Sequence, residues 1–147
     1  MPRANLEAVR RWLDAYNRRD IEELFALNDP EVEFRSIFVA IEPVFRGHDG
    51  IRAYFAGLDD AYEHFELVPR EFIDAGAGVL WAGHVDWRGK ESGAAGRTQI
   101  TVALWLRAGK VFRTETFTDR AHALEAVGLT EEEVRASSYE GSGHSRD

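Results

Sequence analysis

Asp119 is the carboxyl group that is best placed in this sequence for acid or base chemistry. It follows an alternating stretch, residues 110–117, and it precedes residues 120–127, whose apolar side chains recur at helical spacing. A carboxyl held in an apolar pocket has a raised pKa and can act as a general acid or base. An aspartate directly before a helix is also a preferred N-cap. The residue types therefore leave two roles open for Asp119, a cavity acid and a helix cap.

A second pair of ionisable side chains lies on one face of an expected strand, residues 79–88. His84 and Asp86 are two positions apart, and side chains with that spacing are neighbours on a strand. A catalytic pair is one interpretation. A solvated pair is the other, because the opposite face carries large apolar side chains: Trp81, Val85 and Trp87.

The sequence predicts neither a metal site nor a cofactor site. Its five histidines are scattered, without the i, i+2 or i, i+4 spacing of a ligand pair, and the chain has no cysteine. The glycine-rich residues 89–96 lack the Gly-Lys-Ser/Thr ending that cradles phosphates, so they indicate a hairpin tip.

Helical spacing and capping residues predict the helices that must position these groups. Asn5 is expected to cap a first helix, and a second helix is expected at 21–27, behind a capping box at 20–23 and stopped by residues 28–30. A third helix follows the turn at 46–50, with His48 or Asp49 as its N-cap. A fourth is expected at 120–127, closed by Gly128, and a short last helix follows a capping box at 130–133.

Alternation predicts the strands, which cover residues 31–37, 65–73, 79–88, 97–107 and a run that starts at 110. The links between the last four are too short for parallel crossovers, so antiparallel hairpins follow. Residues 38–45 are apolar but contain Glu42 and Pro43, which indicates a loop. Segregated helices and antiparallel strands mean an α+β fold, with helices laid in a curved sheet and a pocket between them.

Length and charge narrow the functional classes. The 147 residues fit one domain, which we place at residues 1–136, with a flexible tail at 137–147. A formal charge of −8 argues against nucleic acid or an anionic membrane as partner. We find no stretch typical of a signal peptide or a membrane span, so we expect a cytoplasmic protein.

Several segments resemble the nuclear transport factor 2-like superfamily. They are Tyr-Asn-Arg-Arg-Asp at 16–20, Asn-Asp-Pro-Glu-Val-Glu-Phe at 28–34, the turn at 45–51, and residues 109–111 with 117–129, which resemble the last strand and helix of its SnoaL-like members. The resemblance covers about residues 6–129. It implies a cone-shaped, strongly curved antiparallel sheet wrapped around N-terminal helices, the cystatin-like α+β barrel.

The resemblance also implies what chemistry to look for. Ketosteroid isomerases of this superfamily use a tyrosine, a general-base aspartate and a protonated aspartate. Their positions correspond here to Trp12, to Arg35 or Ser36, and to a position near Ala103, so that mechanism is not expected. SnoaL-type cyclases resemble this chain in carrying an aspartate at the end of the last strand. This implies Asp119 as general acid or base, with Tyr16 as a hydrogen-bond donor.

Aligning this strand with that of the isomerases also implies that the aromatic face of residues 79–88 points toward the pocket. Threonines of the last strand add hydroxyls without charge, although large side chains of this kind commonly just fill a core. The candidate ligand-binding residues are Trp12, Tyr16, Phe55, Trp81, Trp87, Thr101, Trp105, Phe112, Thr114 and Thr116.

Two functions remain open at this point. The first is a SnoaL-like protein that binds a small apolar molecule in a hydrophobic pocket, without catalysis. The second is a cyclase or isomerase that uses Asp119 on a polyketide-like or cyclic substrate. The resemblance further implies a homodimer through the outer face of the sheet.

Overall fold

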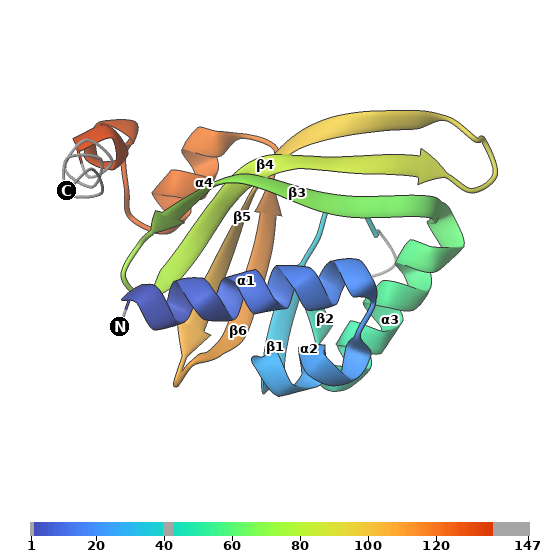
Figure 1. The fold of residues 1–147 in the computed structure, drawn as a ribbon, viewed down its shortest axis with the longest axis horizontal. Coiled ribbons are helices and arrows are strands. Elements are labelled where there is room, and N and C mark those ends of the chain that lie inside the picture. The colour runs from blue at the N-terminus through green and yellow to red at the C-terminus, as the bar shows by residue number, and fades with distance from the viewer. Residues whose placement is uncertain (1, 40–42, 137–147) are drawn as a thin grey trace.

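The chain forms a mixed six-stranded sheet with helices on both of its faces (Figure 1). The structure, a computed structural model, describes residues 2–39 and 43–136, so the expected tail at 137–147 lies outside the described residues. The helices are α1 (Pro2–Arg18), α2 (Ile21–Leu27), α3 (Gly47–Ala61) and α4 (Arg120–Ala126), and the strands are β1 (Asn28–Arg35), β2 (Phe45–Arg46), β3 (Tyr62–Asp74), β4 (Gly78–Gly89), β5 (Ala95–Arg107) and β6 (Lys110–Phe117). Residues 131–136 are also helical. None of the helices in the described ranges has both the length and the apolar character needed to cross a bilayer.

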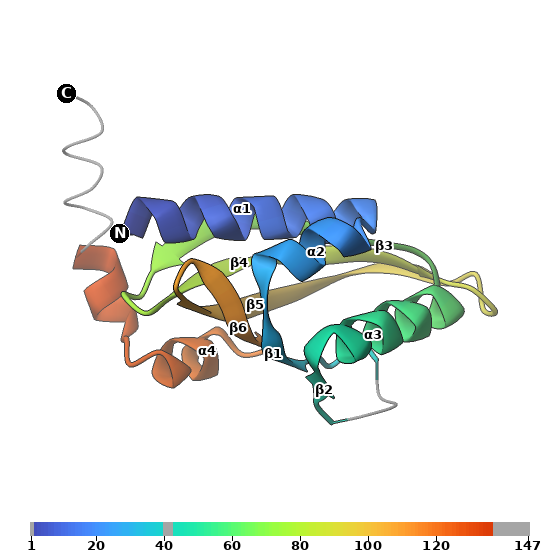
Figure 2. The same ribbon diagram turned by 90° about the horizontal axis from the view of Figure 1, so that it is seen from below.

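The strand order is β2-β1-β6-β5-β4-β3, and the sheet is curled but not closed (Figure 2). Strands β3 to β6 form the expected antiparallel meander. Strand β1 pairs with β6 in parallel, so the sheet is mixed and not wholly antiparallel as expected, and β2 pairs with β1 in antiparallel. The predicted α+β fold, with a strongly curved sheet around N-terminal helices, is confirmed.

Helix α1 presents a buried stripe to the sheet. Val9, Trp12, Leu13 and Tyr16 are at most 5% exposed, as their helical spacing predicts. The helix begins at Pro2, so Asn5 lies inside it and is not its N-cap. Proline can occupy this start because the N–H groups of the first turn have no intrahelical partner.

The next two boundaries differ in part from the sequence prediction. Asp20 caps α2 by accepting from the Glu23 N–H at 3.1 Å, as predicted. Residues 28–30 stop α2 as predicted, but they already belong to β1, whose pairing with β6 is irregular between residues 28 and 33. The prediction of His48 or Asp49 as N-cap of α3 was wrong. Arg46 occupies that position without a side-chain hydrogen bond, because α3 starts directly after β2.

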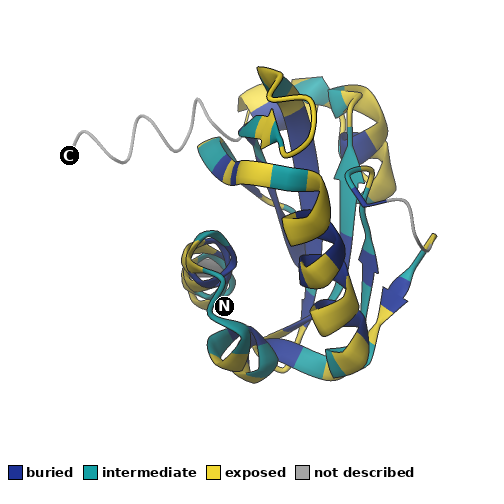
Figure 3. Cartoon of the chain, turned by 90° about the vertical axis from the view of Figure 1, so that its right-hand side faces the viewer, coloured by how far each residue is buried: buried dark blue, intermediate teal, exposed yellow. Residues whose placement is uncertain are grey.

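Alternation along the strands separates two apolar cores, one on each face of the sheet. The inner core packs Trp81 and Val85 of β4 against α1, α2 and α3. The outer core packs Leu80 and Ala103 against Leu124 of α4. The aromatic face of β4 therefore points toward the N-terminal helices, and Figure 3 shows buried positions gathered between the elements.

Side chains at the end of α1 form hydrogen bonds with backbone groups on the free edge of β3. Asn17 donates to the Leu67 carbonyl at 2.9 Å and accepts from the Leu67 N–H at 2.9 Å. Arg19 donates to the Phe65 carbonyl at 3.1 Å. Further along the same strand Pro69 has no N–H to leave unpaired. Helix α1, which carries Trp12 and Tyr16, is thus fastened to the sheet by polar contacts as well as by its apolar stripe.

The C-terminal helices end and begin as predicted. Gly128 follows α4 with φ of +77°, a conformation that glycine adopts without strain. Thr130 and Glu133 form a reciprocal capping box, with each backbone N–H donating to the other residue's side chain at 3.1 Å. Arg120 ties this region to β3 by ion pairs with Glu71 and Glu131 at 2.9 and 2.8 Å.

Candidate functional site

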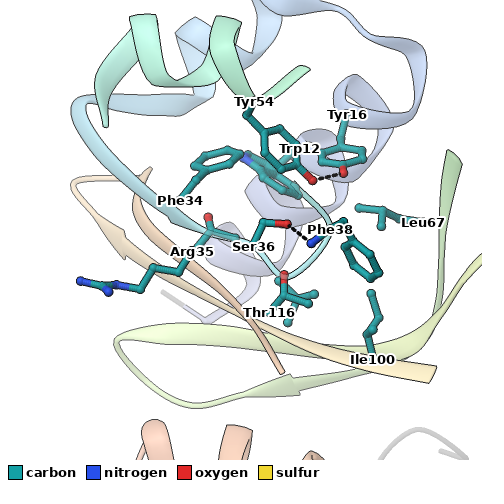
Figure 4. A pocket seen from close by; sticks show the side chains of 12 residues that line it. Trp12, Tyr16, Phe34, Arg35, Ser36, Phe38, Tyr54, Leu67, Ile100 and Thr116 are labelled. Carbon is teal, nitrogen blue, oxygen red and sulfur yellow. Dashed lines mark hydrogen bonds between the residues drawn. The ribbon is translucent and has the colours of Figure 1, made fainter. Parts of the chain in front are cut away.

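A narrow cavity lies between α1, α3 and the concave face of the sheet (Figure 4). Its empty volume is about 340 Å³, but only about 20 Å³ of this is wide enough for the centre of a water molecule. The wall is mostly apolar and aromatic, and its lining residues are Trp12, Tyr16, Phe34, Arg35, Ser36, Phe38, Tyr54, Leu67, Ile100, Val102, Thr114 and Thr116.

Two tyrosine hydroxyls meet at one side of this cavity. Tyr16 of α1 and Tyr54 of α3 are hydrogen-bonded through their phenolic oxygens, and both side chains are at most 3% exposed. Burial raises the pKa of Tyr16 well above its usual range, and the neighbouring Tyr54 adds to this. Burial also raises the pKa of Tyr54, against the opposing effect of the hydrogen bonds with Tyr16 and Ser36. Both phenols therefore stay protonated at neutral pH. Because one O–H is spent in the bond between them, the pair has one O–H left to donate.

Threonine hydroxyls lie on the strand side of the cavity. Thr114 is 5% exposed, and within the described residues its Oγ1 has no hydrogen-bond partner. Thr116 lies two positions further along the same face of β6 and is half-buried. A buried hydroxyl without a partner costs about 1–3 kcal/mol, so the Thr114 hydroxyl is a vacant hydrogen-bonding position in an apolar wall.

No carboxyl or imidazole group is among the residues that line the cavity in the described part of the chain. Among the described residues, the ionisable side chains in the wall are the two tyrosines and Arg35. Figure 4 shows the Arg35 guanidinium directed away from the cavity. An acid–base pair that works near neutral pH is therefore missing from this wall, while neutral hydrogen-bonding groups are present.

The structure brings four of the sequence-predicted ligand residues to the cavity, namely Trp12, Tyr16, Thr114 and Thr116. The indole N–H of Trp12 is already used, because it donates to the Asn28 side chain at 3.3 Å. Asn28 is fully buried and also donates to the Leu24 carbonyl at 2.7 Å. Trp12 thus supplies the cavity with a ring surface and not with a donor.

The other six predicted ligand residues lie elsewhere. Phe55 packs behind Tyr16 with ring centroids 5.0 Å apart. Trp81 is fully buried in the inner core, and Trp87 bonds to Thr98 at 3.0 Å. On the outer face of β5, Thr101 and Trp105 are at alternate positions to the cavity residues, and Phe112 lies in a separate surface cleft.

Asp119 does not reach the cavity. Its carboxylate accepts from the backbone N–H groups of Ala121 and His122 at 2.8 and 3.3 Å, and the side chain is 53% exposed. This is the geometry of an N-cap for α4. The structure therefore separates Asp119 from Tyr16, its expected partner in acid or base chemistry.

Paired substitutions test the role of Asp119. We expect Asp119→Asn to change the free energy of unfolding by less than about 0.5 kcal/mol, because asparagine is an equally good N-cap, whereas Asp119→Ala costs about 1 kcal/mol. Urea unfolding of both variants measures this. An equal loss of stability in the two variants would contradict a capping role and indicate that the charge itself is needed.

The pair His84 and Asp86 lies on the outer face of the sheet. His84 is only 3% exposed, so the solvated interpretation does not describe it, and its Nε2 lies 3.6 Å from Asp86. Asp86 accepts from Arg97 at 2.8 Å, and this hydrogen bond lowers the pKa of Asp86. Neither residue of the pair is among those that line the cavity. In the described residues no group of three potential ligand side chains is arranged to hold a metal ion.

Phe34, Phe38 and Tyr54 line the cavity but are not among the candidate ligand-binding residues from the sequence. For Tyr54, the sequence does contain a feature that predicts a polar contact in the interior. Its hydroxyl falls within a buried helical stripe, and a buried tyrosine O–H almost always has a partner. That partner is Tyr16, 38 positions away, which helical spacing alone does not identify.

Comparison with known proteins places this geometry in context. The sequence model of the SnoaL-like domain matches residues 9–114, which include most of the cavity wall. A comparison with curated protein sequences gave no match.

Solved structures share this fold over most of the chain. An NTF2-like protein of unknown function from Burkholderia pseudomallei K96243 superposes with a TM-score of 0.72 at 20% identity, over 86% of this chain and 98% of that one. TerC, co-crystallised with polyporic acid, superposes with a TM-score of 0.71 at 25% identity, over 84% of this chain and 98% of TerC. A putative SnoaL-like polyketide cyclase from Jannaschia sp. CCS1 superposes with a TM-score of 0.67 at 19% identity, over 84% of this chain and 91% of that one.

Proposed function

Because this chain belongs to the SnoaL-like domain family, we propose that the cavity beneath α1 binds a small, largely apolar molecule. The observation that carries the proposal is the unpartnered, buried hydroxyl of Thr114 in a wall of aromatic side chains. A native protein rarely keeps such a group unsatisfied unless a water or a ligand completes it.

The chemistry of the wall defines the ligand class. Rings from Trp12, Phe34 and Phe38 offer apolar contact, which favours a flat, hydrophobic body. Thr114 and the Tyr16–Tyr54 pair offer neutral donors, which favours one or two uncharged oxygen atoms on the ligand. The cavity is narrow, so the lining side chains must move apart to admit a ring. TerC, the relative co-crystallised with polyporic acid, supports the proposal by analogy.

Binding fits this site better than catalysis. A cyclase or isomerase that used Asp119 would need that carboxyl at the cavity, and its hydrogen bonds to α4 hold it outside. Tyr16 alone supplies a donor but, with its raised pKa, no base at neutral pH. Asp119 therefore forms no part of the proposal.

The test uses 2-naphthol, a flat apolar molecule with one hydroxyl, in isothermal titration calorimetry. We expect Thr116→Phe to weaken 2-naphthol binding at least about tenfold, because the larger ring occupies space that is already scarce. Thr118→Phe is the matched control. Thr118 follows β6, is exposed and does not line the cavity, so its substitution should leave the affinity unchanged.

Equal affinity of the wild type and Thr116→Phe for 2-naphthol would overturn the cavity as the binding site. Urea unfolding of the same variants shows whether the fold is retained, so a loss of binding is not confused with a loss of structure. Native mass spectrometry of the purified protein adds an independent readout, since a co-purified apolar molecule should be absent from Thr116→Phe.

A further inference from the structure

A second hollow lies on the opposite face of the strands that form the cavity wall. About 570 Å³ of it is wide enough for the centre of a water molecule, and its lining residues are Pro30, Glu31, Glu33, Arg46, Gly47, Arg107, Phe112 and Arg113. Phe34 and Thr114 line the cavity, whereas their neighbours Glu33 and Arg113 line this hollow, because successive side chains of a strand point to opposite faces. We call it the arginine cleft, and it shares no lining residue with the cavity.

Three arginines line this cleft, and their side chains remain accessible. The side chains of Arg46, Arg107 and Arg113 are 65%, 60% and 42% exposed. Three arginines in one cleft stand out in a chain whose formal net charge is −8. Guanidinium groups bind carboxylates and phosphates through paired N–H donors.

Each of these arginines has one carboxylate partner, but that partner leaves part of the guanidinium N–H donors unused. Glu33 is shared, since Arg46 bonds to it at 2.5 Å and Arg35 lies 3.6 Å from it. Arg107 has one distant partner, Asp29 at 3.4 Å. Arg113 donates to Glu115 at 3.0 Å through one terminal nitrogen, while its buried Nε has no partner among the described residues. Many guanidinium donors are thus left for another acceptor.

The cleft also has an apolar wall. Phe112 is half-buried at the start of β6, where the pairing of β5 and β6 is irregular, and the Arg107 guanidinium lies 4.6 Å from the centre of its ring. Pro30 lines the same hollow. A ring placed beside Phe112 would keep an attached anionic group within reach of the arginines.

We propose that the arginine cleft binds an organic oxyanion, a carboxylate or phosphate group carried on a ring. Arg46, Arg107 and Arg113 hold the anionic group, and Phe112 contacts the ring. The cleft lies on the other face of the sheet from the cavity, so this inference does not depend on the ligand proposed there. Glu31, which is exposed and has no ion-pair partner in the described residues, opposes the anion and limits its affinity.

Calorimetric titrations with phenyl phosphate, benzoate and inorganic phosphate at low ionic strength test the proposal. Phenyl phosphate or benzoate should bind more tightly than inorganic phosphate, and their relative affinities show which anionic group is preferred. Arg107→Gln and Arg113→Gln should each raise the dissociation constant of the preferred probe about tenfold. Glu31→Gln should lower it, because it removes a like charge.

Two controls locate the site. Arg88→Gln removes an exposed arginine that bonds to Gly93 in the hairpin tip, and it should leave the affinity unchanged. Thr116→Phe fills the cavity and should likewise have no effect on the preferred probe. The proposal is overturned if none of the three probes binds, or if Arg107→Gln and Arg113→Gln bind as the wild type does. It is also overturned if Thr116→Phe abolishes binding, since the probe would then occupy the cavity.

Discussion

Asn17→Leu is expected to lower the free energy of unfolding by about 2–4 kcal/mol, because it leaves two backbone groups of β3 without their partners. The Asn17 amide bonds to both the N–H and the carbonyl of Leu67 at 2.9 Å, as a neighbouring strand would do. Leucine is close in size but offers neither a donor nor an acceptor. The loss should reach the cavity too, since Trp12 and Tyr16 lie on the same helix and Leu67 lines the wall.

Chemical denaturation of Asn17→Leu measures this effect, and Asn5→Leu is the matched control. Asn5 lies on the same helix, is half-buried and makes no side-chain hydrogen bond that the structure records. Its replacement should change stability by no more than about 0.5 kcal/mol. If the two variants were equally stable, the bonds from Asn17 would be contributing nothing to the docking of α1.

Gly83→Ala is expected to destabilise the protein by about 3 kcal/mol or more, through overpacking within the sheet. A Cβ atom at Gly83 would lie 2.1 Å from the Val68 carbonyl oxygen and 3.0 Å from the Arg70 nitrogen. These are backbone atoms of the paired strand, at the place where its register shifts between residues 69 and 71, so they cannot rotate away. Relief would require β3 and β4 to separate locally.

Gly93→Ala provides the comparison for Gly83→Ala in thermal and urea unfolding. Gly93 is in the hairpin tip with φ of +68°, and an added Cβ would meet no atom within 4 Å. Its substitution should cost only about 1 kcal/mol of backbone strain. A smaller loss for Gly83→Ala than for Gly93→Ala would show that the strands move apart more easily than their close approach indicates.

Local signals predicted much of the fold. The apolar stripe of α1, the capping box at residues 130–133 and the left-handed Gly128 each depend on residues within one or two helical turns. Boundaries failed where a distant contact decides. Asn28 stops α2 as its residue type predicts, but it is also the first residue of β1, where it pairs with Val111 and accepts from the Trp12 indole 16 positions away.

The site was less predictable, for physical reasons. Period two identified Thr114 and Thr116 as one face of a strand, and both lie at the cavity. The same rule cannot tell which face of a sheet meets an opening, so Thr101 and Trp105 were grouped with them although they lie on the other side. For Asp119, a cap and a catalytic acid use the same residue type in the same place, and only the direction of its carboxylate separates them.

The division into two cores also bears on how the molecule opens. The outer core is the smaller of the two, and α4 with residues 131–136 covers it through Leu124 and Val134. Contacts between this cover and β3 include the partly buried ion pair of Arg120 with Glu71. Such a segment can unfold as a local cooperative unit at a lower free energy than global unfolding. Amide hydrogens of α4 would then exchange with solvent while those of α1, and the cavity beneath it, stay protected.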